Sequence, residues 1–499
     1  MPYIRRITVL KRIPPNTVTT AWEVLIDGVL LMWQQETRYL PKQQKFAFRM
    51  LQGDFRTYQG EWTIVAEGDL VTVTFSAELD WGAYNMSRFF GQTFEKRAER
   101  TFRGMLLSFE REVSRRSRQS NCAALPRFGY ISNLLSQHLT ANGYGDKDID
   151  KKRPELFEET LKWLPPFRRG IVTGVKSSLG TEVMGDMILL NLLPKQMLIE
   201  DDALVLGRLL EAGRMAVRFG DKILGLGSYA ANVGRKGVHL AKHLPIPVTT
   251  GSSYTIAVVI EAIHEACRTI GLALADASIA IVGATGTIGS ICAHMLAVDA
   301  GRLVLVARNQ HRLETLSGDL LERYGTEVTC TIDLNSAITN ADIVITATNT
   351  PGALIDVHKL KPGTIVYDVS QPPNVSEKDA QSRPDVLVLD GGVVKPPGPV
   401  DFHFSFGLAP GLAYACIAEV MILALAGRYE AYSLGGDITL GKVREISGLG
   451  QKHGFVLAGL RSFGKEVTAL QLEWARQAVL MRRKNAYEHL PAINSHIAT

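Results

Sequence analysis

Hydrophobic residues recur at every second position in part of the first hundred residues. Val71, Val73 and Phe75 alternate with polar residues and continue to Leu79, a period of two that predicts a half-buried strand. Residues 46–50 and 60–65 predict two more antiparallel strands, separated by turns at 53–54 and 67–69. A helical period follows over 88–114, where Phe90, Phe94, Ala98, Phe102, Met105, Phe109 and Val113 share one face. We therefore expect an α+β domain over residues 1–118, in which a sheet holds a long helix.

Short, continuous apolar runs alternate with amphipathic stretches in the second half of the chain. The runs at 279–282, 303–306, 342–346, 364–368 and 385–389 predict buried parallel strands. This alternation favours an α/β fold with a Rossmann-type, doubly wound sheet over 271–430. Before it we expect a linker over 119–158 and a substrate-binding α/β region over 159–270, with a hairpin around 178–180 and helices at 202–218 and 253–270. Residues 431–499 are expected to be helical.

A glycine-rich turn joins the first of these strands to a helix. Gly283, Gly286 and Gly289 follow the strand, with Thr285, Thr287 and Ile288 between them. Glycines let a backbone approach a pyrophosphate closely, and a helix N-terminus supplies free N–H groups and partial positive charge. The spacing Gly-x-x-Gly-x-x-Gly at the end of a strand therefore predicts a dinucleotide site.

The end of the second strand indicates which dinucleotide binds. NAD sites of this type usually carry Asp or Glu there, but this chain has Arg308 and Asn309, with Arg312 one turn later. A guanidinium can pair with a 2′-phosphate, which favours NADPH. The alternative is that Arg308 is a solvated charge. Thr346 and Thr348, at the end of the third strand, are candidates to approach the nicotinamide ribose.

Composition and charge narrow the class of protein. The chain has 499 residues, 46% hydrophobic and 21% charged, with a formal net charge of +5, which is typical of a folded protein of two or three domains. No nucleic-acid motif accompanies the mild basic excess. Five scattered cysteines form neither a metal pattern nor a disulfide framework, which favours a cytoplasmic protein without a bound metal. We expect no signal peptide and no transmembrane segment, which leaves peripheral membrane contact open. Residues 405–427 predict a buried core helix.

The N-terminal segment resembles the polyketide-cyclase/START-like family of helix-grip lipid carriers. Residues 53–55 and 60–62 carry the resemblance, together with the strand that ends at Asp80. The resemblance implies an apolar cavity between the sheet and the helix. The family's usual first strand and two short helices are not evident in this sequence, so the domain is expected to be incomplete. An accessory domain with a solid core is the alternative.

Cys416 is the best candidate nucleophile that the residues themselves indicate. It follows Pro410 and Gly411 within the first turns of a predicted helix, where the helix dipole favours a thiolate. A buried, inert cysteine is the alternative on pattern alone. Weaker candidates for binding substrate lie before another helix and are Thr249, Thr250, Gly251 and Ser252, which are equally consistent with helix capping. Glu419, His403 and His453 could orient a partner or transfer a proton, or could be structural.

Residues 170–460 resemble the aldehyde-forming long-chain acyl-(acyl-carrier-protein) reductases of cyanobacteria. Several separated segments carry the resemblance in order: 191–197, 249–251, 282–290, 307–310, Asn374, 390–394, 415–419 and 452–455. The resemblance implies that Cys416 is the acyl acceptor: its sulfur attacks a thioester of acyl-carrier protein or CoA. It also implies that NADPH then reduces the acyl group to an aldehyde. The proline-rich stretch between Gly392 and Ala415 departs from the family.

The expected function is therefore NADPH-dependent reduction of a long-chain acyl thioester to a fatty aldehyde. Two alternatives stay open. A shikimate-dehydrogenase-like or glutamyl-tRNA-reductase-like oxidoreductase would share the nucleotide domain, and the first of these needs no cysteine. A non-catalytic lipid-binding protein would keep only a vestigial nucleotide site. The sequence leaves chain length, the choice of carrier and the oligomeric state undetermined.

Overall fold

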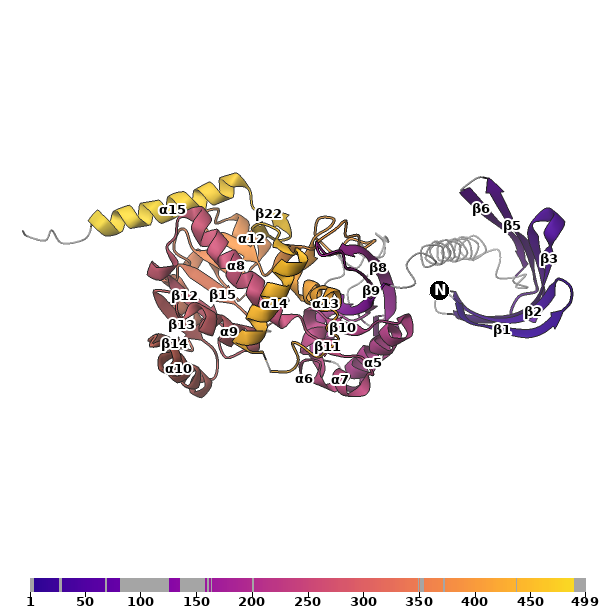
Figure 1. Ribbon diagram of the computed structural model, residues 1–499, viewed down its shortest axis with the longest axis horizontal. Coiled ribbons are helices and arrows are strands. Elements are labelled where there is room, and N and C mark those ends of the chain that lie inside the picture. The colour runs from indigo at the N-terminus through magenta and orange to yellow at the C-terminus, as the bar shows by residue number, and fades with distance from the viewer. Residues whose placement is uncertain are drawn as a thin grey trace, which may run out of the picture. The chain divides into compact units, whose positions relative to one another are not determined.

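The structure is a computed structural model of the 499-residue chain. It describes residues 4–26, 29–67, 70–80, 125–134, 158, 161–162, 164–199, 202–348, 350, 354–370, 373–436 and 438–488. The chain divides into two compact units, residues 1–124 and residues 125–499, and each is described by itself (Figure 1).

The described part of the first unit is an antiparallel sheet in which each strand pairs with the next along the chain. Its strands are β1 (Ile4–Ile13), β2 (Thr17–Ile26), β3 (Val29–Leu40), β4 (Lys45–Gly53), β5 (Thr57–Glu67) and β6 (Leu70–Asp80), with a 3-10 turn η1 (Pro41–Gln43). Figure 1 shows that the sheet curves strongly. Its buried hydrophobic side chains are Val24, Trp33, Phe48, Phe55 and Tyr58. Aromatic side chains thus dominate the buried apolar face of this sheet.

The N-terminal predictions succeed in part. The strands expected at 46–50, 60–65 and 71–79 are confirmed as β4, β5 and β6. The long strands β1, β2 and β3 were not predicted, and the expectation that the first strand is missing is wrong, because β1 pairs with β2 along its length. The helix expected over 88–114 lies outside the described residues.

A mixed sheet forms the first lobe of the second unit, which we define as residues 125–249. Its order is β11-β10-β7-β9-β8, and all neighbours are parallel except the hairpin of β8 with β9. The strands are β7 (Arg127–Asn133), β8 (Phe167–Lys176), β9 (Glu182–Leu190), β10 (Ile223–Leu226) and β11 (Val248–Thr249). The helices are α4 (Pro194–Ile199), α5 (Asp202–Phe219), η3 (Ser228–Asn232), α6 (Val233–Lys236) and α7 (Val238–His243).

The first lobe corrects one prediction. The hairpin around 178–180 and the helix at 202–218 are confirmed as β8–β9 and α5. The linker expected over 119–158 contains β7, the central strand of this sheet, so that interpretation is wrong for residues 127–133. The apolar run 128–131 was a strand signal, but the charged residues around it suggested a linker.

A parallel sheet of order β14-β13-β12-β15-β16-β17 forms the second lobe, which we define as residues 278–390. Its strands are β12 (Ser278–Val282), β13 (Arg302–Val306), β14 (Val328–Thr331), β15 (Ile343–Thr346), β16 (Ile365–Asp368) and β17 (Leu387–Asp390). The helices between them are α9 (Thr287–Leu296), α10 (Gln310–Tyr324), α11 (Leu334–Thr339), η5 (Val357–Lys359) and α12 (Glu377–Gln381), and η4 (Leu274–Asp276) precedes β12. This is the Rossmann-type strand order. Five of the strands were predicted, and the edge strand β14 was missed.

Successive residues of β12 face opposite sides of this sheet. Ile279 and Ile281 belong to the core that includes α8 and α9, whereas Ala280 and Val282 pack with Ile338 on the other side. Both faces are therefore covered, which explains why the strands read as continuous apolar runs.

Further helices belong to the second unit. They are α8 (Ser252–Ile270), α13 (Ala415–Leu425), α14 (Leu440–His453) and α15 (Ala469–Glu488). Helices α8 and α14 lie side by side, and α13 packs against α8 and against strands β7 and β10 (Figure 1). Helix α13 is buried almost throughout, which confirms the core helix expected within 405–427. None of the described helices combines the length and apolar character needed to cross a membrane.

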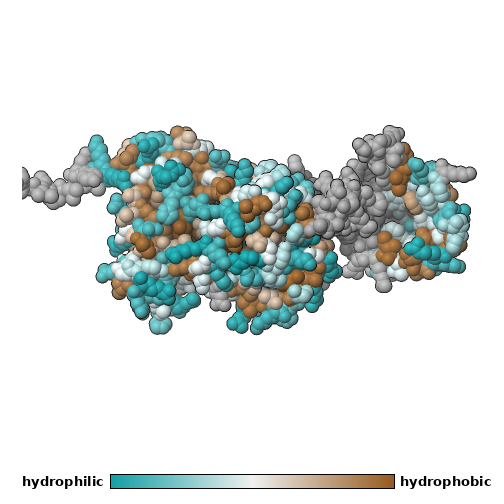
Figure 2. Space-filling model, in the orientation of Figure 1, coloured by the Kyte–Doolittle hydropathy of each residue, from teal (hydrophilic) through white to brown (hydrophobic). Residues whose placement is uncertain are grey.

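Short strands complete the C-terminal part. They are β18 (Val393–Lys395), β19 (Ala413–Tyr414), β20 (Val456–Leu457), β21 (Arg461–Ser462) and β22 (Lys465–Glu466). Residues 431–499 were expected to be helical, and they contain α14 and α15 but also three of these strands. Figure 2 shows hydrophobic and hydrophilic residues interspersed over the described surface of the second unit on the face drawn.

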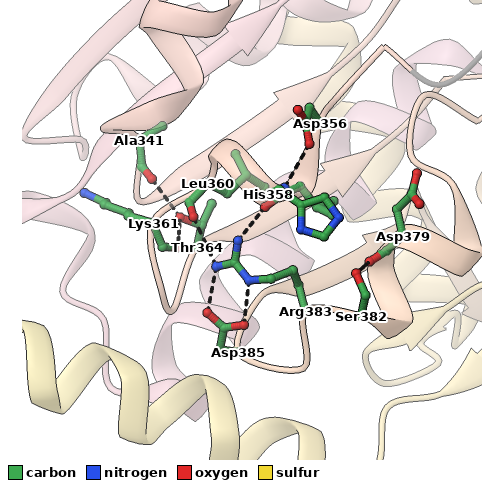
Figure 3. A network of polar contacts seen from close by, with 11 residues as sticks. Ala341, Asp356, His358, Leu360, Lys361, Thr364, Asp379, Ser382, Arg383 and Asp385 are labelled. Atoms are coloured by element: carbon green, nitrogen blue, oxygen red, sulfur yellow. Dashed lines mark hydrogen bonds and ion pairs between the residues drawn. The ribbon is translucent and has the colours of Figure 1, made fainter.

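Polar contacts fasten the amino ends of β16 and β17 (Figure 3). Arg383 donates to both carboxylate oxygens of Asp385, at 2.9 and 2.7 Å, and to the carbonyl oxygens of Val357 and Leu360. The Thr364 hydroxyl donates to the carbonyl of Ala341 at 3.0 Å. Because the glycine turn follows the carboxyl end of β12, this network lies at the opposite edge of the sheet and has a structural role.

Candidate active site

Cys416 is the second residue of α13, at the junction of the two lobes. The chain reaches it from β17 through Gly392, whose carbonyl accepts a hydrogen bond from the amide of Ala415 at 2.8 Å. Strand β19, just before Cys416, pairs with β18, just after Gly392. Since parallel strands end at one edge, this route brings Cys416 to the edge of the second-lobe sheet where the glycine turn lies.

Tyr130 is the side chain that meets Cys416 from the first lobe. Its phenolic oxygen lies 3.0 Å from the Cys416 sulfur, and its ring is 2% exposed. Glycines make room for this pair: a Cβ at Gly227 would lie 1.7 Å from the Tyr130 oxygen, and one at Gly225 would lie 2.7 Å from its ring. A Cβ at Gly251, which has φ +75°, would lie 2.4 Å from Cys416 Cα. The pair is thus closely enclosed by backbone.

Opposing effects set the protonation of Cys416. Burial raises the pKa of its thiol, and the hydrogen bond from Tyr130 and the amide of Ile417 lower it in part. The net direction is upward, so the dipole activation expected from sequence does not dominate in this structure. Burial also raises the pKa of Tyr130 well above its usual value, which keeps the phenol as a donor. The site therefore holds a neutral thiol beside a neutral phenol.

Glu419 is fully buried one turn after Cys416 and anchors the start of α8. Its carboxylate accepts from the Thr249 hydroxyl at 2.5 Å and from the Tyr254 amide at 2.8 Å, and lies 3.0 Å from the Ser433 hydroxyl. Burial raises the pKa of Glu419, and these hydrogen bonds offset part of that rise. The arrangement fixes α13 against α8 and so fixes Gly251 against Cys416.

The remaining weak substrate-binding candidates lie in the same network. The Thr250 hydroxyl donates to the Ser433 carbonyl at 2.8 Å and lies 3.0 Å from the half-buried Ser252 hydroxyl. Neither hydroxyl caps α8, because its N-cap residue is Gly251 without a side-chain bond. Thr249 and Thr250 are therefore engaged with other segments, and the Gly251 backbone is the member shown to pack against Cys416.

The two candidate histidines have other partners. The buried His453 Nδ1 lies 2.9 Å from the Ser177 hydroxyl, and burial lowers its pKa. His403 Nδ1 lies 2.8 Å from Asp401 and its Nε2 lies 3.3 Å from the Thr173 hydroxyl. Both contacts tie segments of the fold together.

The glycine turn has the close-packed geometry that a dinucleotide site needs. A Cβ at Gly283, which has φ +83°, would lie 2.5 Å from the Ala347 carbonyl oxygen, and one at Gly289 would lie 2.4 Å from the Gly283 carbonyl oxygen. Helix α9 then begins at Thr287 without a side-chain cap. Uncapped first-turn amides behind a tight glycine turn fit a pyrophosphate, so the residues present, Thr285, Gly286, Thr287 and Ile288 among them, suit the cofactor expected.

Side chains at the end of β13 are arranged for different tasks. Arg308 is exposed just beyond the strand. Asn309 caps α10 by accepting from the Arg312 amide at 3.0 Å. The Arg312 guanidinium donates to the Thr285 carbonyl at 2.9 Å, so it reaches back to the glycine turn. Arg308 and Arg312 thus leave two guanidinium groups on the side of the turn where the sequence predicts a 2′-phosphate.

Thr346 lies in a buried network at the end of β15. Its hydroxyl donates to Asn374 at 2.7 Å and lies 3.3 Å from the Ser370 hydroxyl. The hydroxyl of the half-buried Thr348 donates a weaker hydrogen bond to the same Asn374 oxygen at 3.4 Å. Thr346 therefore positions the two loops beyond β15 and β16, and the contact of either threonine with a ribose stays a prediction.

Sequence reasoning missed two side chains of this region. Tyr130 lay in the supposed linker, and Lys236 follows no motif, although its ammonium donates to the Thr287 hydroxyl at the start of α9. Neither could be found without the fold, because 286 positions separate Tyr130 from Cys416 and 51 separate Lys236 from Thr287.

Comparisons with known families agree with this division of the chain. Residues 1–106 match the family described as polyketide cyclase / dehydrase and lipid transport, and residues 265–390 match shikimate / quinate 5-dehydrogenase. The quinate dehydrogenase of Corynebacterium glutamicum, solved with NAD, aligns at 14% identity over 65% of this chain and 98% of its own, with a TM-score of 0.30.

Two curated proteins share about a third of their aligned residues with the chain. Aminotransferase PigE of Serratia sp. is 32% identical over 255 residues, 50% of this chain and 30% of that protein. Long-chain acyl-[acyl-carrier-protein] reductase of Synechococcus elongatus is 32% identical over 215 residues, 42% of this chain and 61% of that protein. The chain thus spans less than two thirds of the length of either relative.

Both resemblances expected from the sequence are confirmed, as is the α/β fold with a Rossmann-type domain and an N-terminal helix-grip-like sheet. The homologues support an NAD(P)-dependent oxidoreductase as the class of enzyme. The chain is similar to long-chain acyl-[acyl-carrier-protein] reductase, and residues 1–106 are similar to the polyketide cyclase and lipid transport family.

Proposed function

We propose that this chain is an NADPH-dependent reductase that converts a long-chain fatty acyl thioester to a fatty aldehyde through an acyl-enzyme on Cys416. The observation that carries the proposal is the Cys416–Tyr130 pair, 3.0 Å apart, on the route from β17 at the edge of the glycine turn. A nucleophile with a hydrogen-bond donor at its sulfur is what thioester exchange requires. The carrier is acyl-carrier protein or CoA.

Cys416 and its neighbours perform the first half-reaction. The sulfur attacks the thioester carbonyl carbon, and the bond from that carbon to the carrier sulfur breaks. The proton lost by the Cys416 thiol ends on the departing carrier thiolate, so no external acid is consumed. Tyr130 donates to the Cys416 sulfur and stabilises its negative charge as the proton leaves, while the α13 amides at Cys416 and Ile417 add partial positive charge.

The second half-reaction releases the aldehyde. Bound NADPH supplies a hydride equivalent to the acyl carbon. The glycine turn, Arg308 and Arg312 would hold the dinucleotide, and breakage of the carbon–sulfur bond would return Cys416, which regains a proton. Tyr130 again donates to the sulfur as the bond breaks. The balance is one thioester, one NADPH and one proton giving an aldehyde, NADP⁺ and the free carrier thiol.

The first unit is proposed to receive the apolar acyl chain. Its sheet holds a hollow lined by Trp22, Trp33, Gln35, Phe48, Tyr58, Trp62 and Phe75. Trp22 and Trp33 stack with ring centroids 5.6 Å apart. Broad aromatic faces with one polar group suit an apolar chain, and quenching of tryptophan fluorescence by an added long-chain acyl-CoA would report its arrival.

A shikimate-dehydrogenase-like reaction is the competing proposal, supported by the match over 265–390. That match covers the second lobe and neither Tyr130 nor Cys416, so it bears on the dinucleotide rather than on the substrate. A reaction of this kind would transfer a hydride directly and would leave Cys416 without a role. The covalent adduct therefore separates the two proposals.

The test is NADPH oxidation with a long-chain acyl-CoA or acyl-carrier-protein thioester, with extraction of the product. Before NADPH is added, the intact mass and peptide map of the enzyme are recorded. We expect a fatty aldehyde and an acyl group on the peptide that contains Cys416. C416A should lose both and still bind NADPH, whereas C330A, at a half-buried cysteine of β14, should keep both. Turnover retained by C416A would refute the acyl-enzyme, and lipid binding without turnover would favour a carrier.

A further inference from the structure

Residues 234–237 form a left-handed turn in the first lobe. Gly234, Arg235, Lys236 and Gly237 have φ values of +59°, +57°, +55° and +81°. The left-handed conformation costs a non-glycine residue about 1–2 kcal/mol, and two such residues stand here in succession. The turn is held by the Gly435 amide, which donates to the Lys236 carbonyl at 3.0 Å. The backbone thus holds the Lys236 side chain in a defined direction.

The Lys236 ammonium reaches out of the first lobe to the second. It donates to the hydroxyl of Thr287, the first residue of α9. Thr287 directly follows Gly286 of the glycine turn. The contact therefore joins the first lobe to the part of the second lobe where a pyrophosphate is expected.

A second cation approaches the same turn. Arg312 donates to the Thr285 carbonyl at 2.9 Å, and burial together with the charge of Arg312 lowers the pKa of Lys236. Within the described residues, neither cation forms an ion pair with a carboxylate. An anion with several oxygens, such as a phosphate group, stabilises two cations and an uncapped helix N-terminus that converge in this way.

We propose that Lys236 is a pyrophosphate-binding residue that the first lobe supplies to the dinucleotide site, so that the bound dinucleotide bridges the two lobes. The inference rests on the dinucleotide-binding part of the proposed function and is independent of the thioester chemistry. Pyrophosphate is favoured over the 2′-phosphate because Lys236 contacts the first residue of α9, whereas Arg308 lies at the end of β13, where the ribose is bound in such folds.

A glycine substitution gives a clean test. K236G removes the ammonium and suits the left-handed backbone, so the variant is expected to fold as stably as the unmodified protein. K236R keeps a cation at the same place. K242M is the matched control, because Lys242 is an exposed lysine of α7, six residues along the same segment.

Dissociation constants are measured by fluorescence titration for NADPH and NADH and by displacement for adenosine 2′-monophosphate, which has a 2′-phosphate but no 5′-phosphate or pyrophosphate. We expect K236G to weaken NADPH and NADH by the same factor, about tenfold or more, and to leave adenosine 2′-monophosphate unchanged. K242M should change none of the three, and K236R should lose much less than K236G.

Several outcomes would overturn the inference. Unchanged affinity of K236G for both nucleotides would show that the ammonium has no ligand role. A loss confined to NADPH and adenosine 2′-monophosphate would place Lys236 at the 2′-phosphate, and failure of the unmodified protein to bind either NADPH or NADH would refute the site. Absence of aldehyde formation in a protein that binds nucleotides and shows the K236G effect would refute only the thioester chemistry.

Discussion

The Tyr130 hydroxyl lies 3.0 Å from the Cys416 sulfur, although 286 positions separate the two residues. Tyr130 comes from the central strand of the first lobe, and Cys416 starts the helix that follows the second lobe. The contact therefore exists only when both lobes are folded and packed on α13. It makes the reactivity of the cysteine a property of the assembled unit.

Replacing Tyr130 with Phe should make Cys416 less reactive. The phenol lowers the pKa of the thiol by hydrogen bonding to the sulfur, so its removal raises that pKa further and reduces the thiolate fraction at a given pH. We expect the pH profile of iodoacetamide alkylation, followed on the Cys416 peptide, to move to higher pH in Y130F. Y229F, at a buried tyrosine of η3, should leave the profile in place. An unmoved profile in Y130F would show that the phenol does not influence the thiol.

Gly251 should not tolerate a side chain. G251A places a Cβ 2.4 Å from Cys416 Cα and forces alanine into φ +75°, so we expect a loss of about 2–4 kcal/mol in the free energy of unfolding, with altered alkylation of Cys416. Gly271 ends the same helix at φ +73° with no atom within 4 Å of the added Cβ. G271A therefore measures the backbone cost alone. Equal losses in the two variants, by denaturant unfolding, would contradict the steric argument.

Arg308 should decide between NADPH and NADH. Removal of its guanidinium in R308A is expected to weaken NADPH about tenfold and to leave NADH affinity unchanged, because only NADPH carries the 2′-phosphate. R302A, at the exposed amino end of the same strand, should alter neither affinity. Fluorescence titration measures both, and an equal effect of R308A on the two nucleotides would identify Arg308 as a solvated charge.

Asp221 should make stability fall as pH rises. Burial and the neighbouring Asp186 carboxylate raise the pKa of Asp221 to about 9, while the unfolded chain has an ordinary value near 3.8. At a pH between these two pKa values, the folded state binds one more proton than the unfolded chain. The stabilising contribution of Asp221 is therefore complete below the pKa of the unfolded chain and is lost as the pH rises through the pKa of the folded state. D221N mimics the protonated form.

We expect D221N to flatten the decline in the free energy of unfolding between about pH 5 and pH 8. The measurement is denaturant unfolding at several pH values. D276N, at an exposed aspartate of η4, should leave the pH dependence as it is. A D221N variant with the unmodified slope would show that Asp221 is ionised in the folded state.

The period of hydrophobic residues was enough to predict much of the fold. Strands β12, β13, β15, β16 and β17 are continuous apolar runs because helices cover both faces of their sheet, and such runs are recognised without knowledge of neighbours. Edge strand β14 escaped because its partly polar residues depend on pairing for their stability, and β7 escaped because the charged residues around it suggested a linker. The long strands β1–β3 escaped because alternation in them is irregular.

The amino-acid sequence by itself determined the glycine turn, the Rossmann-type sheet it implies, the candidate cysteine and the resemblance to acyl-thioester reductases, because these depend on local spacing and on residue types. Only the tertiary structure decided which groups meet. It brought Tyr130 to Cys416, engaged Glu419 and Thr249 with each other, and directed Lys236 from one lobe to Thr287 in the other. Contacts between distant segments arise from the packing of lobes, and no local pattern in the chain encodes them.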